Sequence, residues 1–474
     1  MNLIKTAFAA IISALPLAAL SDGTDDGGPG RPWSDVSVFR INKEEPRAFF
    51  VPHFTLDGAS APVDTDGVEN IYDIPSAKLL NGVWKFRFLD SPDEMDPAFM
   101  SDSFDDSGWD GIDVPCSWQA RGYDTVFYNN ITLEMFFDKE GRWLPGFHKR
   151  RGEEMSEAAR APFVPEAHRQ SGIYRRTFEV PGDWDGREVF VRFCGVRTGF
   201  ELYVNGKFAG YSEDSFTPAE FNITKFLRKG RNSMAVRVFK FTTGAYFEMQ
   251  DMPHMMGIIR DVVLLARPKL HIGDYYAPHE LSPDMKDARM QISATVRNLS
   301  GRAARGAELR AWLVDNSTGA RSRIFSAAVP EAAPGGVAEV SGEAEVRGVR
   351  LWSPDRPSLY TLVLELADAD GKTLEAVSAD YAFRKFEIRQ KTLFLNGKRM
   401  LIKGANRHDW SPDKGKAVDF SWMKKDAELM AAANVNAVRT AHYPNDDKFL
   451  MLCSRYGLTV MDENNFETHG LREE

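Results

Sequence analysis

Cysteine is scarce in this sequence, and its three cysteines, Cys116, Cys194 and Cys453, lie far apart. An odd number at such wide spacing matches neither a disulfide framework nor a zinc site. Each cysteine lies in an apolar or strand-like stretch. We therefore predict three buried free thiols.

The sequence also lacks an excess of positive charge. Its 474 residues include 59 Lys and Arg against 68 Asp and Glu, which gives a formal net charge of −9. A protein that binds nucleic acid needs a basic surface against the phosphate backbone. The composition therefore predicts no nucleic-acid partner.

Long hydrophobic runs are missing except at the N-terminus, where an apolar run from Thr6 to Leu20 follows Lys5. A charge, an apolar core and small residues in that order are typical of a secretory signal. We predict a signal peptide over residues 1–21 and an exported protein, periplasmic or extracellular; an N-terminal helix of a cytosolic protein is the alternative. No other run approaches the ~20 residues of a membrane-spanning helix, so we expect no membrane span.

The chain has enough length and apolar content, 43% hydrophobic residues, for several domains with separate cores. Residues 22–75 begin with a stretch rich in Gly, Asp and Pro, which predicts a linker and an N-terminal extension, with structure from about Trp33. Residues 76–268 alternate short strand-like runs with turns, and Asn205-Gly206 is a strong hairpin signal. This region predicts an antiparallel β-sandwich.

Residues 269–385 contain a second series of strand-like runs. Apolar and polar residues alternate in 291–296 and in 360–364, as in strands with one face on a core. A region of about a hundred residues without a helical period predicts an immunoglobulin-like β-sandwich.

Residues 386–474 show a different pattern, in which three apolar strands alternate with two amphipathic helices. In the first helix Met423 and Ala427 share a face, and Ser421 is expected to cap the N-terminus. The second helix is expected to end at Gly457. Strands and helices in this order predict a parallel sheet with right-handed crossovers.

Ionisable side chains after the three strands are candidate site residues, because the chemistry of such folds lies at the carboxyl ends of the strands. Glu467 and His469 are two residues apart in an extended segment and project to the same side. By itself, such a pair also fits a solvated surface. The full set is Asn406, Arg407, His408, Arg439, His442, Asp462, Glu463, Asn465, Glu467 and His469.

Several colinear segments carry a family resemblance. They are VPCSWQARGYDTVFYNN, QSGIYRRTFEVP, NGKFAGYSEDSFTPAEFNIT, LWSPDRPSLY, LNGKRMLIKGANRHDWSP, NAVRTAHYPND and LTVMDENNFETHG. In this order they resemble the β-galactosidases of glycoside hydrolase family 2, from about Trp33 to the last residue. The resemblance implies a jelly-roll sugar-binding domain over 76–268, an immunoglobulin-like domain over 269–385, and the first three βα units of a TIM (β/α)8 barrel over 386–474.

The resemblance also implies substrate-binding residues. Asn130 and Asp214 lie on loops of the first domain, and His408 and His442 end the first two barrel strands. All four are implied to bind the hydroxyl groups of a β-galactoside, for which amides, carboxylates and imidazoles are suited. From the residues alone, the favoured interpretation of Asp214 is that it ends a strand in a turn.

Two ions are implied as well. Glu467 and His469 resemble part of a magnesium site, although histidine is a less usual ligand for this hard cation. A sodium ion is implied near Asp214.

The chain departs from the family pattern in two places. Pro253 and His254 replace the bulky aromatic and the cation of the family motif Q-D-M-W-R-x-S-G-I, which leaves the shape of that loop open. The insertion from Leu133 to Pro165 is longer and more charged than the family's connection, and its role is open.

The resemblance implies retaining hydrolysis of terminal β-D-galactosides, which needs two carboxylic acids about 5–5.5 Å apart. In the family both lie downstream of the segment with Glu467 and His469, so we expect no catalytic carboxylate up to Glu474. We therefore expect the N-terminal part of a longer enzyme, inactive alone, with an uncovered apolar surface on its open barrel. Glu463 and Glu467 come from one short segment and are not expected to form the pair.

Two other interpretations stay open. The chain could be a non-catalytic galactoside-binding protein, or part of another β-glycosidase of the same family, such as a mannosidase or a glucuronidase. The segments YNN, SEDS and QDM favour galactose. The oligomeric state stays open, with a homo-oligomer of the full-length form as one alternative, because family members assemble through several surfaces.

Overall fold

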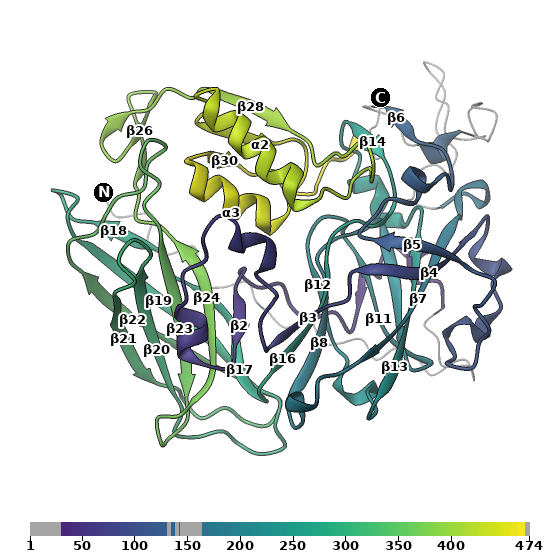
Figure 1. Cartoon of the computed structure of the whole chain (residues 1–474), viewed down its shortest axis with the longest axis horizontal. Coiled ribbons are helices and arrows are strands. Elements are labelled where there is room, and N and C mark those ends of the chain that lie inside the picture. Colours follow the sequence, from purple (N-terminus) through teal and green to yellow (C-terminus); the bar gives the residue numbers. More distant parts are fainter. Residues whose placement is uncertain (1–29, 130–133, 138–141, 143–163, 470–474) are drawn as a thin grey trace. The chain divides into compact units, whose positions relative to one another are not determined.

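The computed structural model describes residues 30–129, 134–137, 142 and 164–469. The predicted signal peptide over 1–21 and most of the insertion from Leu133 to Pro165 lie outside these residues. Residues Arg31–Glu474 form one compact unit, and it contains three domains (Figure 1).

The first domain is a β-sandwich of two antiparallel sheets. One sheet has the strand order β1-β11-β10-β13-β7-β4-β5 and the other β12-β8-β16-β3. Alternate residues of both sheets, such as Trp84, Tyr174 and Phe193, are buried between them. The strands are β1 (Arg40–Ile41), β3 (Ala77–Leu79), β4 (Gly82–Leu89), β5 (Asp110–Val114), β7 (Ser171–Glu179), β8 (Glu188–Phe193), β10 (Gly199–Val204), β11 (Lys207–Glu213), β12 (Ala219–Asn222), β13 (Arg231–Phe239) and β16 (Val262–Arg267).

Short elements complete this sandwich. Strand β6 (Phe127–Asn129) pairs with β14 (Met252–His254), and β9 (Val196–Arg197) pairs with β15 (Gly257–Ile258). The loops contain the 3-10 helices η1 (Pro32–Ser34), η3 (Pro92–Glu94), η4 (Pro97–Met100), η5 (Trp118–Arg121), η6 (Glu134–Phe136), η8 (Glu166–His168), η9 (Gly182–Trp184), η10 (Thr224–Phe226) and η11 (Thr243–Phe247).

The hairpin predicted at Asn205-Gly206 is confirmed between β10 and β11. Asn205 has φ 50° and Gly206 has φ 79°. Two positive φ values in a row give the turn whose twist matches the strands, and Asn-Gly is the pair that adopts them at least cost.

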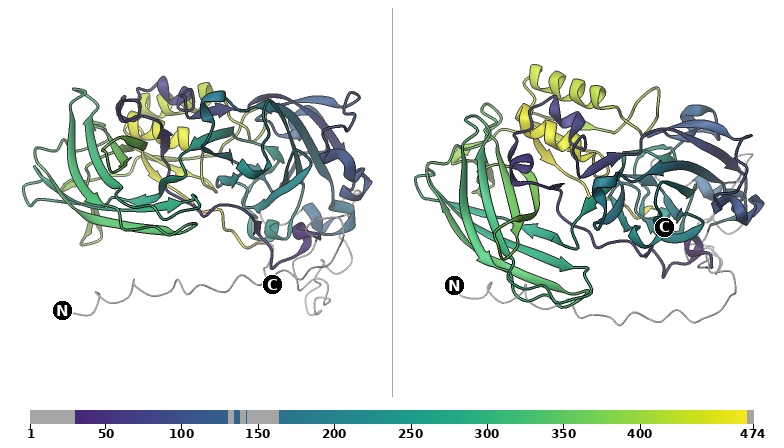
Figure 2. Two further views of the ribbon diagram at one scale, coloured as in Figure 1. Left: turned by 90° about the horizontal axis from the view of Figure 1, so that it is seen from below. Right: turned by 60° about the horizontal axis from the view of Figure 1, so that its bottom comes forward.

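The second domain is the predicted immunoglobulin-like sandwich, seen as two stacked layers in Figure 2. One sheet is centred on β19 and the other has the order β2-β24-β23-β20-β21. Alternating residues such as Ile292, Leu309 and Leu364 form its core. The strands are β17 (Leu270–Tyr276), β18 (His279–Leu281), β19 (Ala288–Asn298), β20 (Glu308–Asp315), β21 (Arg321–Ala328), β22 (Val337–Val346), β23 (Tyr360–Ala367) and β24 (Thr373–Tyr381).

The N-terminal extension contributes to all three domains. Strand β1 adds to the edge of the first sandwich, and β2 (Val51–His53) pairs with β24 of the second. Helix α1 (Leu56–Ser60) packs on β23 and β24, and η2 (Gly67–Asn70) contacts α3 of the third domain. Residues 31–75 therefore link the three domains.

The third domain begins with an antiparallel sheet of β25 (Phe386–Arg389), β26 (Thr392–Leu395) and β27 (Lys398–Arg399). The predicted βα pattern follows, with α2 (Phe420–Ala432) and α3 (Asp447–Tyr456) between parallel strands. These strands are β28 (Gly404–Arg407), β29 (Ala437–Thr440) and β30 (Thr459–Met461), in that spatial order.

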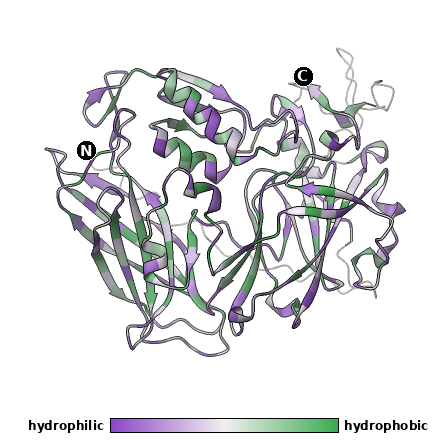
Figure 3. Cartoon of the chain, in the orientation of Figure 1, coloured by the Kyte–Doolittle hydropathy of each residue, from purple (hydrophilic) through white to green (hydrophobic). Residues whose placement is uncertain are grey.

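The predicted start of α2 is wrong, and the predicted end of α3 is confirmed. Ser421 does not cap α2, because the helix starts one residue before it and Asp419 holds the N-cap position. Gly457 does end α3, with φ 73° and its N–H donating to the carbonyl of Cys453. Met423, Ala427, Phe449 and Leu452 are buried between the helices and the sheet, and Figure 3 shows apolar residues on both helices.

Helix α3 is fixed by both sandwiches. Near its N-terminus, Lys448 Nζ lies 2.8 Å from Asp261 of the first domain. Near its C-terminus, Arg455 pairs with Asp380 and the indole of Trp352 donates to the carbonyl of Ser454 at 2.8 Å. The two sandwiches thereby set the position of the parallel strands.

The predicted uncovered apolar surface is present in the third domain. Leu401, Trp422, Leu429 and Met461 are 69%, 43%, 56% and 61% exposed. Among the residues described, no helix is long and apolar enough to cross a membrane.

The three cysteines are free and buried, as predicted. Burial raises the pKa of Cys194 and of Cys453 to about 12. These thiols therefore stay protonated and behave as small apolar side chains.

A buried ion pair joins β16 of the first domain to β24 of the second. Arg267 Nε and Nη2 lie 2.7 and 2.8 Å from the two carboxylate oxygens of Glu375. Glu375 also accepts from the backbone N–H of Ile272 at 2.9 Å. The side chains of Arg267 and Glu375 are only 4% and 2% exposed, so removal of either charge leaves the other buried without its partner.

We predict that Glu375→Gln lowers the free energy of unfolding of the first cooperative transition by about 3–5 kcal/mol, as broken buried pairs do. Urea unfolding followed by tryptophan fluorescence measures it. Glu343→Gln breaks the exposed pair with Arg289 and serves as the control, with a change below about 1 kcal/mol. Equal effects of the two substitutions would contradict the prediction.

Candidate functional site

The candidate site lies where the three parallel strands end. The register places Arg407 beside Thr440, and Arg439 beside both Asn406 and Met461. The loops after these strands therefore start at one edge of the sheet. The predicted clustering of polar residues at this edge is confirmed by the contacts below.

His408 and His442 come together at this edge. Their rings lie edge to face with centroids 5.3 Å apart. Burial, with help from the charges of Lys416 and His442, lowers the pKa of His408 to about 4. His408 is therefore neutral at neutral pH and can both donate and accept a hydrogen bond.

His442 is oriented by two neighbours. Its Nδ1 lies 3.2 Å from Arg439 Nη2 and 3.3 Å from Glu463 Oε2. Arg439 and Glu463 form an ion pair with each other, so the end of β29 and the loop after β30 are tied together around the imidazole.

Tyr443 joins this edge to the first domain. Its ring stacks on that of Phe216, with centroids 4.0 Å apart and 11° between the planes. Lys416 Nζ donates to its hydroxyl at 2.7 Å, and His408 Nδ1 lies 3.3 Å from the same oxygen. Burial, together with the charge of Arg197, holds the pKa of Lys416 well below its usual range.

Asp214 has the conformation of a strand-ending turn and also faces the third domain. It follows β11 directly with φ 84°, in the left-handed region. Its Oδ2 accepts from the hydroxyl of Thr217, and its Oδ1 accepts from Nδ2 of Asn465 at 2.8 Å. The turn therefore presents the carboxylate to the loop after β30.

Asn465 was only a minor candidate, but it forms several hydrogen bonds between the third domain and the first. Its amide nitrogen also donates to Glu248 Oε1 at 2.7 Å, and its oxygen accepts from Gln250 Nε2 at 2.8 Å. Glu248 was not among the candidates, because nothing in its sequence context marks it as different from a surface residue. It is buried, and it accepts from the N–H of Ser215 at 2.9 Å.

Glu467 and His469 face each other, as predicted. His469 Nε2 lies 2.8 Å from Glu467 Oε1. The segment is held by an isolated parallel bridge between Glu467 and Glu248, in which the N–H of Glu467 donates to the carbonyl of Phe247 at 2.7 Å and that of Met249 donates to the carbonyl of Glu467 at 3.1 Å. No group of three or more metal-ligating side chains occurs in the part of the chain that the structure describes.

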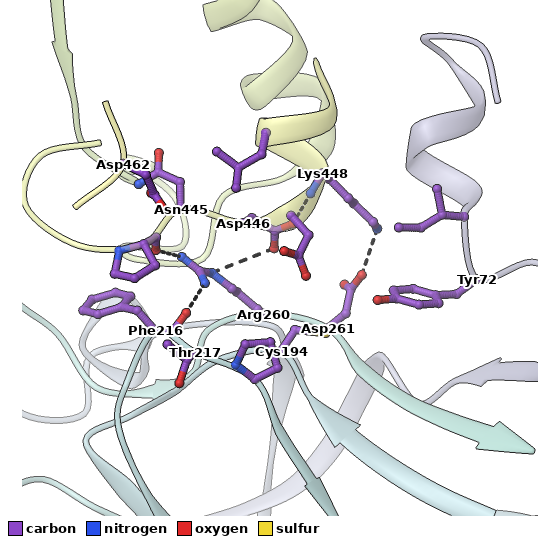
Figure 4. A pocket seen from close by; sticks show the side chains of 15 residues that line it. Tyr72, Cys194, Phe216, Thr217, Arg260, Asp261, Asn445, Asp446, Lys448 and Asp462 are labelled. Atoms are coloured by element: carbon purple, nitrogen blue, oxygen red, sulfur yellow. Dashed lines mark hydrogen bonds and ion pairs between the residues drawn. The ribbon is translucent and has the colours of Figure 1, made fainter. Parts of the chain in front are cut away.

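Arg260 contacts all three loops that carry the described sugar-binding candidates, and Figure 4 shows it between Phe216 and Asp446. Its guanidinium donates to the carbonyl of Phe216 at 2.7 Å, to Asp409 Oδ2 at 3.0 Å and to the carbonyl of Pro444 at 2.6 Å. These partners lie within two residues of Asp214, His408 and His442, respectively. Sequence analysis missed Arg260, since it lies far along the chain from the loops that it joins.

Acidic groups surround this arginine. Burial opposes ionisation of Asp409, but Arg407 and Arg260 outweigh it and lower its pKa below the usual range. Asp446 lies 3.9 Å from Arg260 Nε, and its pKa is raised to about 6, mainly by burial. A cavity of about 130 Å³ is lined by Arg260 and by Asp261, Asp446 and Asp462.

The remaining expectations have separate outcomes. Asn130 lies outside the described residues. The segment in which Pro253 and His254 depart from the family pattern forms β14, and His254 Nδ1 lies 2.8 Å from Arg197 Nη2. The loop therefore has a defined shape, held by a buried histidine–arginine contact.

Glu248 generates a prediction about pH. Burial and the charge of Asp214 raise its pKa to about 7, against the donors from Ser215. As pH rises above 4.5, the usual pKa of a glutamate, the carboxyl ionises first in the unfolded chain. This group's contribution to stability is therefore lost as pH rises to about 7. Glu248→Gln keeps the hydrogen-bonding shape without the charge.

We therefore expect Glu248→Gln to match the stability of the wild type near pH 5. At pH 8 its free energy of unfolding, measured by urea denaturation, should be higher than that of the wild type by up to about 3 kcal/mol. Glu343→Gln, at an exposed position, should show no such pH dependence. A Glu248→Gln protein that is less stable than the wild type at pH 8 would contradict the view that the buried Glu248 carboxylate destabilises the fold at high pH.

Comparison with family models matches three consecutive parts of the chain. They are "Glycosyl hydrolases family 2, sugar binding domain" over residues 157–268, "Glycosyl hydrolases family 2" over 270–384, and "Glycosyl hydrolases family 2, TIM barrel domain" over 386–474. The three matches follow the order of the three domains described above.

The similar proteins agree with these matches. A beta-galactosidase of Priestia megaterium is 35% identical over 92% of this chain, and one of Pectobacterium atrosepticum is 37% identical over 84%. The chain spans 40% and 36% of those relatives, respectively. The solved structure of Bacteroides uniformis beta-glucuronidase shares the fold, with a TM-score of 0.66 and 24% identity over 82% of this chain and 42% of that one. The chain therefore belongs to glycosyl hydrolase family 2.

Proposed function

We propose that the chain is part of a β-galactosidase, which hydrolyses terminal β-D-galactosides with retention. The observation that carries this proposal is the convergence of Asp214, His408 and His442 on one edge through Arg260. Two imidazoles at the carboxyl ends of parallel strands, with a carboxylate from the first domain, suit the recognition of sugar hydroxyls. The similarity to two beta-galactosidases supports galactose as the sugar.

The charges at the site favour a neutral sugar over a uronic acid. A glucuronide would bring a carboxylate, which is best bound by an arginine with free donors. At this edge the guanidinium of Arg407 is buried and paired with Asp409 and Asp426, and that of Arg439 is paired with Glu463. A glucuronidase is therefore the second candidate, supported by the shared fold alone.

We also propose that these residues bind substrate without turning it over. Retaining hydrolysis needs an acid/base and a nucleophile about 5–5.5 Å apart. Glu463 is engaged by Arg439 and His442, and Glu467 by His469, so neither carboxylate is free to attack a sugar. The catalytic pair would be supplied by the part of the relatives' length that this chain does not span.

Magnesium and sodium ions fit this proposal. The carboxylate of Glu467 and the imidazole of His469 are close enough to share a cation, and two protein ligands suffice for Mg²⁺, which keeps several waters. When bound, the metal would add positive charge near the reacting oxygens. A sodium ion would take an oxygen of Asp214.

We expect the chain to bind a β-galactoside weakly and to release no aglycone from it. Saturation-transfer NMR with methyl β-D-galactoside, beside a fluorogenic galactoside assay, measures both. His442→Ala should weaken binding by about tenfold, since it removes a hydrogen bond to a sugar hydroxyl. His53→Ala, in β2 of the immunoglobulin-like domain, is the control. Equal binding by wild type and His442→Ala, or tighter binding of a glucuronide, would contradict the site.

Export is proposed from the N-terminal sequence. We expect protein recovered from the periplasm or medium of an expressing bacterium to begin near residue 22, after removal of residues 1–21. N-terminal sequencing or intact mass determines this. An intact Met1 on protein retained in the cytosol would contradict export.

A further inference from the structure

A cavity of about 400 Å³ lies on the outer face of the seven-stranded sheet of the first domain. Its floor is formed by β4, β7 and β13. Because Phe86, Tyr174 and Met234 point into the core, the neighbouring Lys85 and Arg175 point to the opposite face. The loop over residues 101–106 and the turn over 228–231 form the walls.

Positive charge dominates this cavity. Four cationic side chains of the outer face line it against two carboxylates. The cationic residues are Lys85, Arg175, Arg228 and Arg231, and the carboxylates are Asp102 and Asp106. The whole chain has a formal net charge of −9, so this is a local concentration of positive charge.

Two of the arginines hold the cavity together. Arg175 Nε lies 2.7 Å from Asp106, and both of its terminal nitrogens donate to the carbonyl of Ser101 at 3.1 Å. Arg228 pairs with Asp102. The walls are therefore built by hydrogen bonds and do not depend on a ligand.

Lys85 and Arg231 differ from these two arginines. Within the described residues, neither forms an ion pair with a carboxylate. Lys85 Nζ has only the carbonyls of Ser107 and Trp109, both at the long distance of 3.4 Å. Arg231 stands opposite the exposed Glu179 in the sheet register without an ion pair between them. Two cations thus face the cavity with donors to spare.

We propose that this cavity binds a saccharide that carries an oxyanion, either a sulfate ester or a uronic acid carboxylate. Arg231 and Lys85 would bind the oxyanion through charge-assisted hydrogen bonds. The hydroxyl of Thr177 and the apolar ring of Phe104, which also line the cavity, suit sugar hydroxyls and the apolar face of a sugar ring. The volume is within the range of ligand sites.

This inference goes beyond the proposed hydrolysis. The cavity lies on the outer face of a sheet in the first domain, and the residues that line it do not include those at the carboxyl ends of β28–β30. It would let the first domain bind a polysaccharide at a second site, through sulfate or carboxylate groups that the galactoside site does not recognise. Its test measures binding alone, so it stands or fails separately from the glycosidase proposal.

The test is isothermal titration of the whole chain at an ionic strength of about 0.15 M, which screens non-specific attraction. The probes are a sulfated galactotetraose, the same tetraose without sulfate, a tetragalacturonate and inorganic sulfate. We expect binding of at least one anionic oligosaccharide and none of the neutral one. Arg231→Gln and Lys85→Gln should each weaken it roughly tenfold, as loss of a charge-assisted hydrogen bond does.

Lys229→Gln is the matched control, because it removes one positive charge from the same turn at an exposed residue that does not line the cavity. It should leave the affinity unchanged. Circular dichroism checks that every variant is folded. Failure to bind both anionic oligosaccharides, binding of inorganic sulfate alone, or equal losses in Lys229→Gln and Arg231→Gln would each overturn the proposal.

Discussion

The buried guanidinium of Arg260 is the constraint on which the candidate site depends. A charged group away from water is tolerated only when its donors are satisfied, and Arg260 satisfies them on three separate loops. Two of these loops follow parallel strands, and the third follows β11 of the first sandwich. Because the same guanidinium binds all three, a shift of any one loop would leave donors unpaired. The relative positions of Asp214, His408 and His442 therefore follow from one side chain.

The ionisable side chains around the candidate site are mostly neutral or paired with an opposite charge. Burial keeps His408 neutral near pH 7 and raises the pKa of Glu248 to about 7, so neither brings an isolated full charge into the interface. The amide of Asn465, donating to Asp214 and Glu248, supplies hydrogen bonds without charge. Such an edge can offer donors and acceptors to sugar hydroxyls. It contrasts with the outer face of the first domain, where Lys85 and Arg231 form no ion pair with any residue that the structure describes.

Local patterns in the sequence predicted much of this fold. The Asn205-Gly206 hairpin and the cap at Gly457 follow from backbone preferences of a few adjacent residues, and both are confirmed. The prediction that Ser421 caps α2 was wrong, because the helix starts at Phe420 and Asp419 is its N-cap residue. Glu248 and Arg260 could not be predicted in their roles, since their partners are distant in sequence: Asn465 is 217 residues from Glu248, and Pro444 is 184 from Arg260. Only the folded chain brings such pairs together.

Hydrogen–deuterium exchange of Arg260→Gln, compared with the wild type, tests the central role of this arginine most directly. If one guanidinium positions the three loops, exchange should rise together in residues 214–217, 407–411 and 441–446, while the core strands of both sandwiches stay protected. The control Lys448→Met removes a contact of α3 with Asp261 and should leave the loop over 214–217 unchanged. An Arg260→Gln protein whose exchange rises only beside residue 260, or in none of the three loops, would contradict this account.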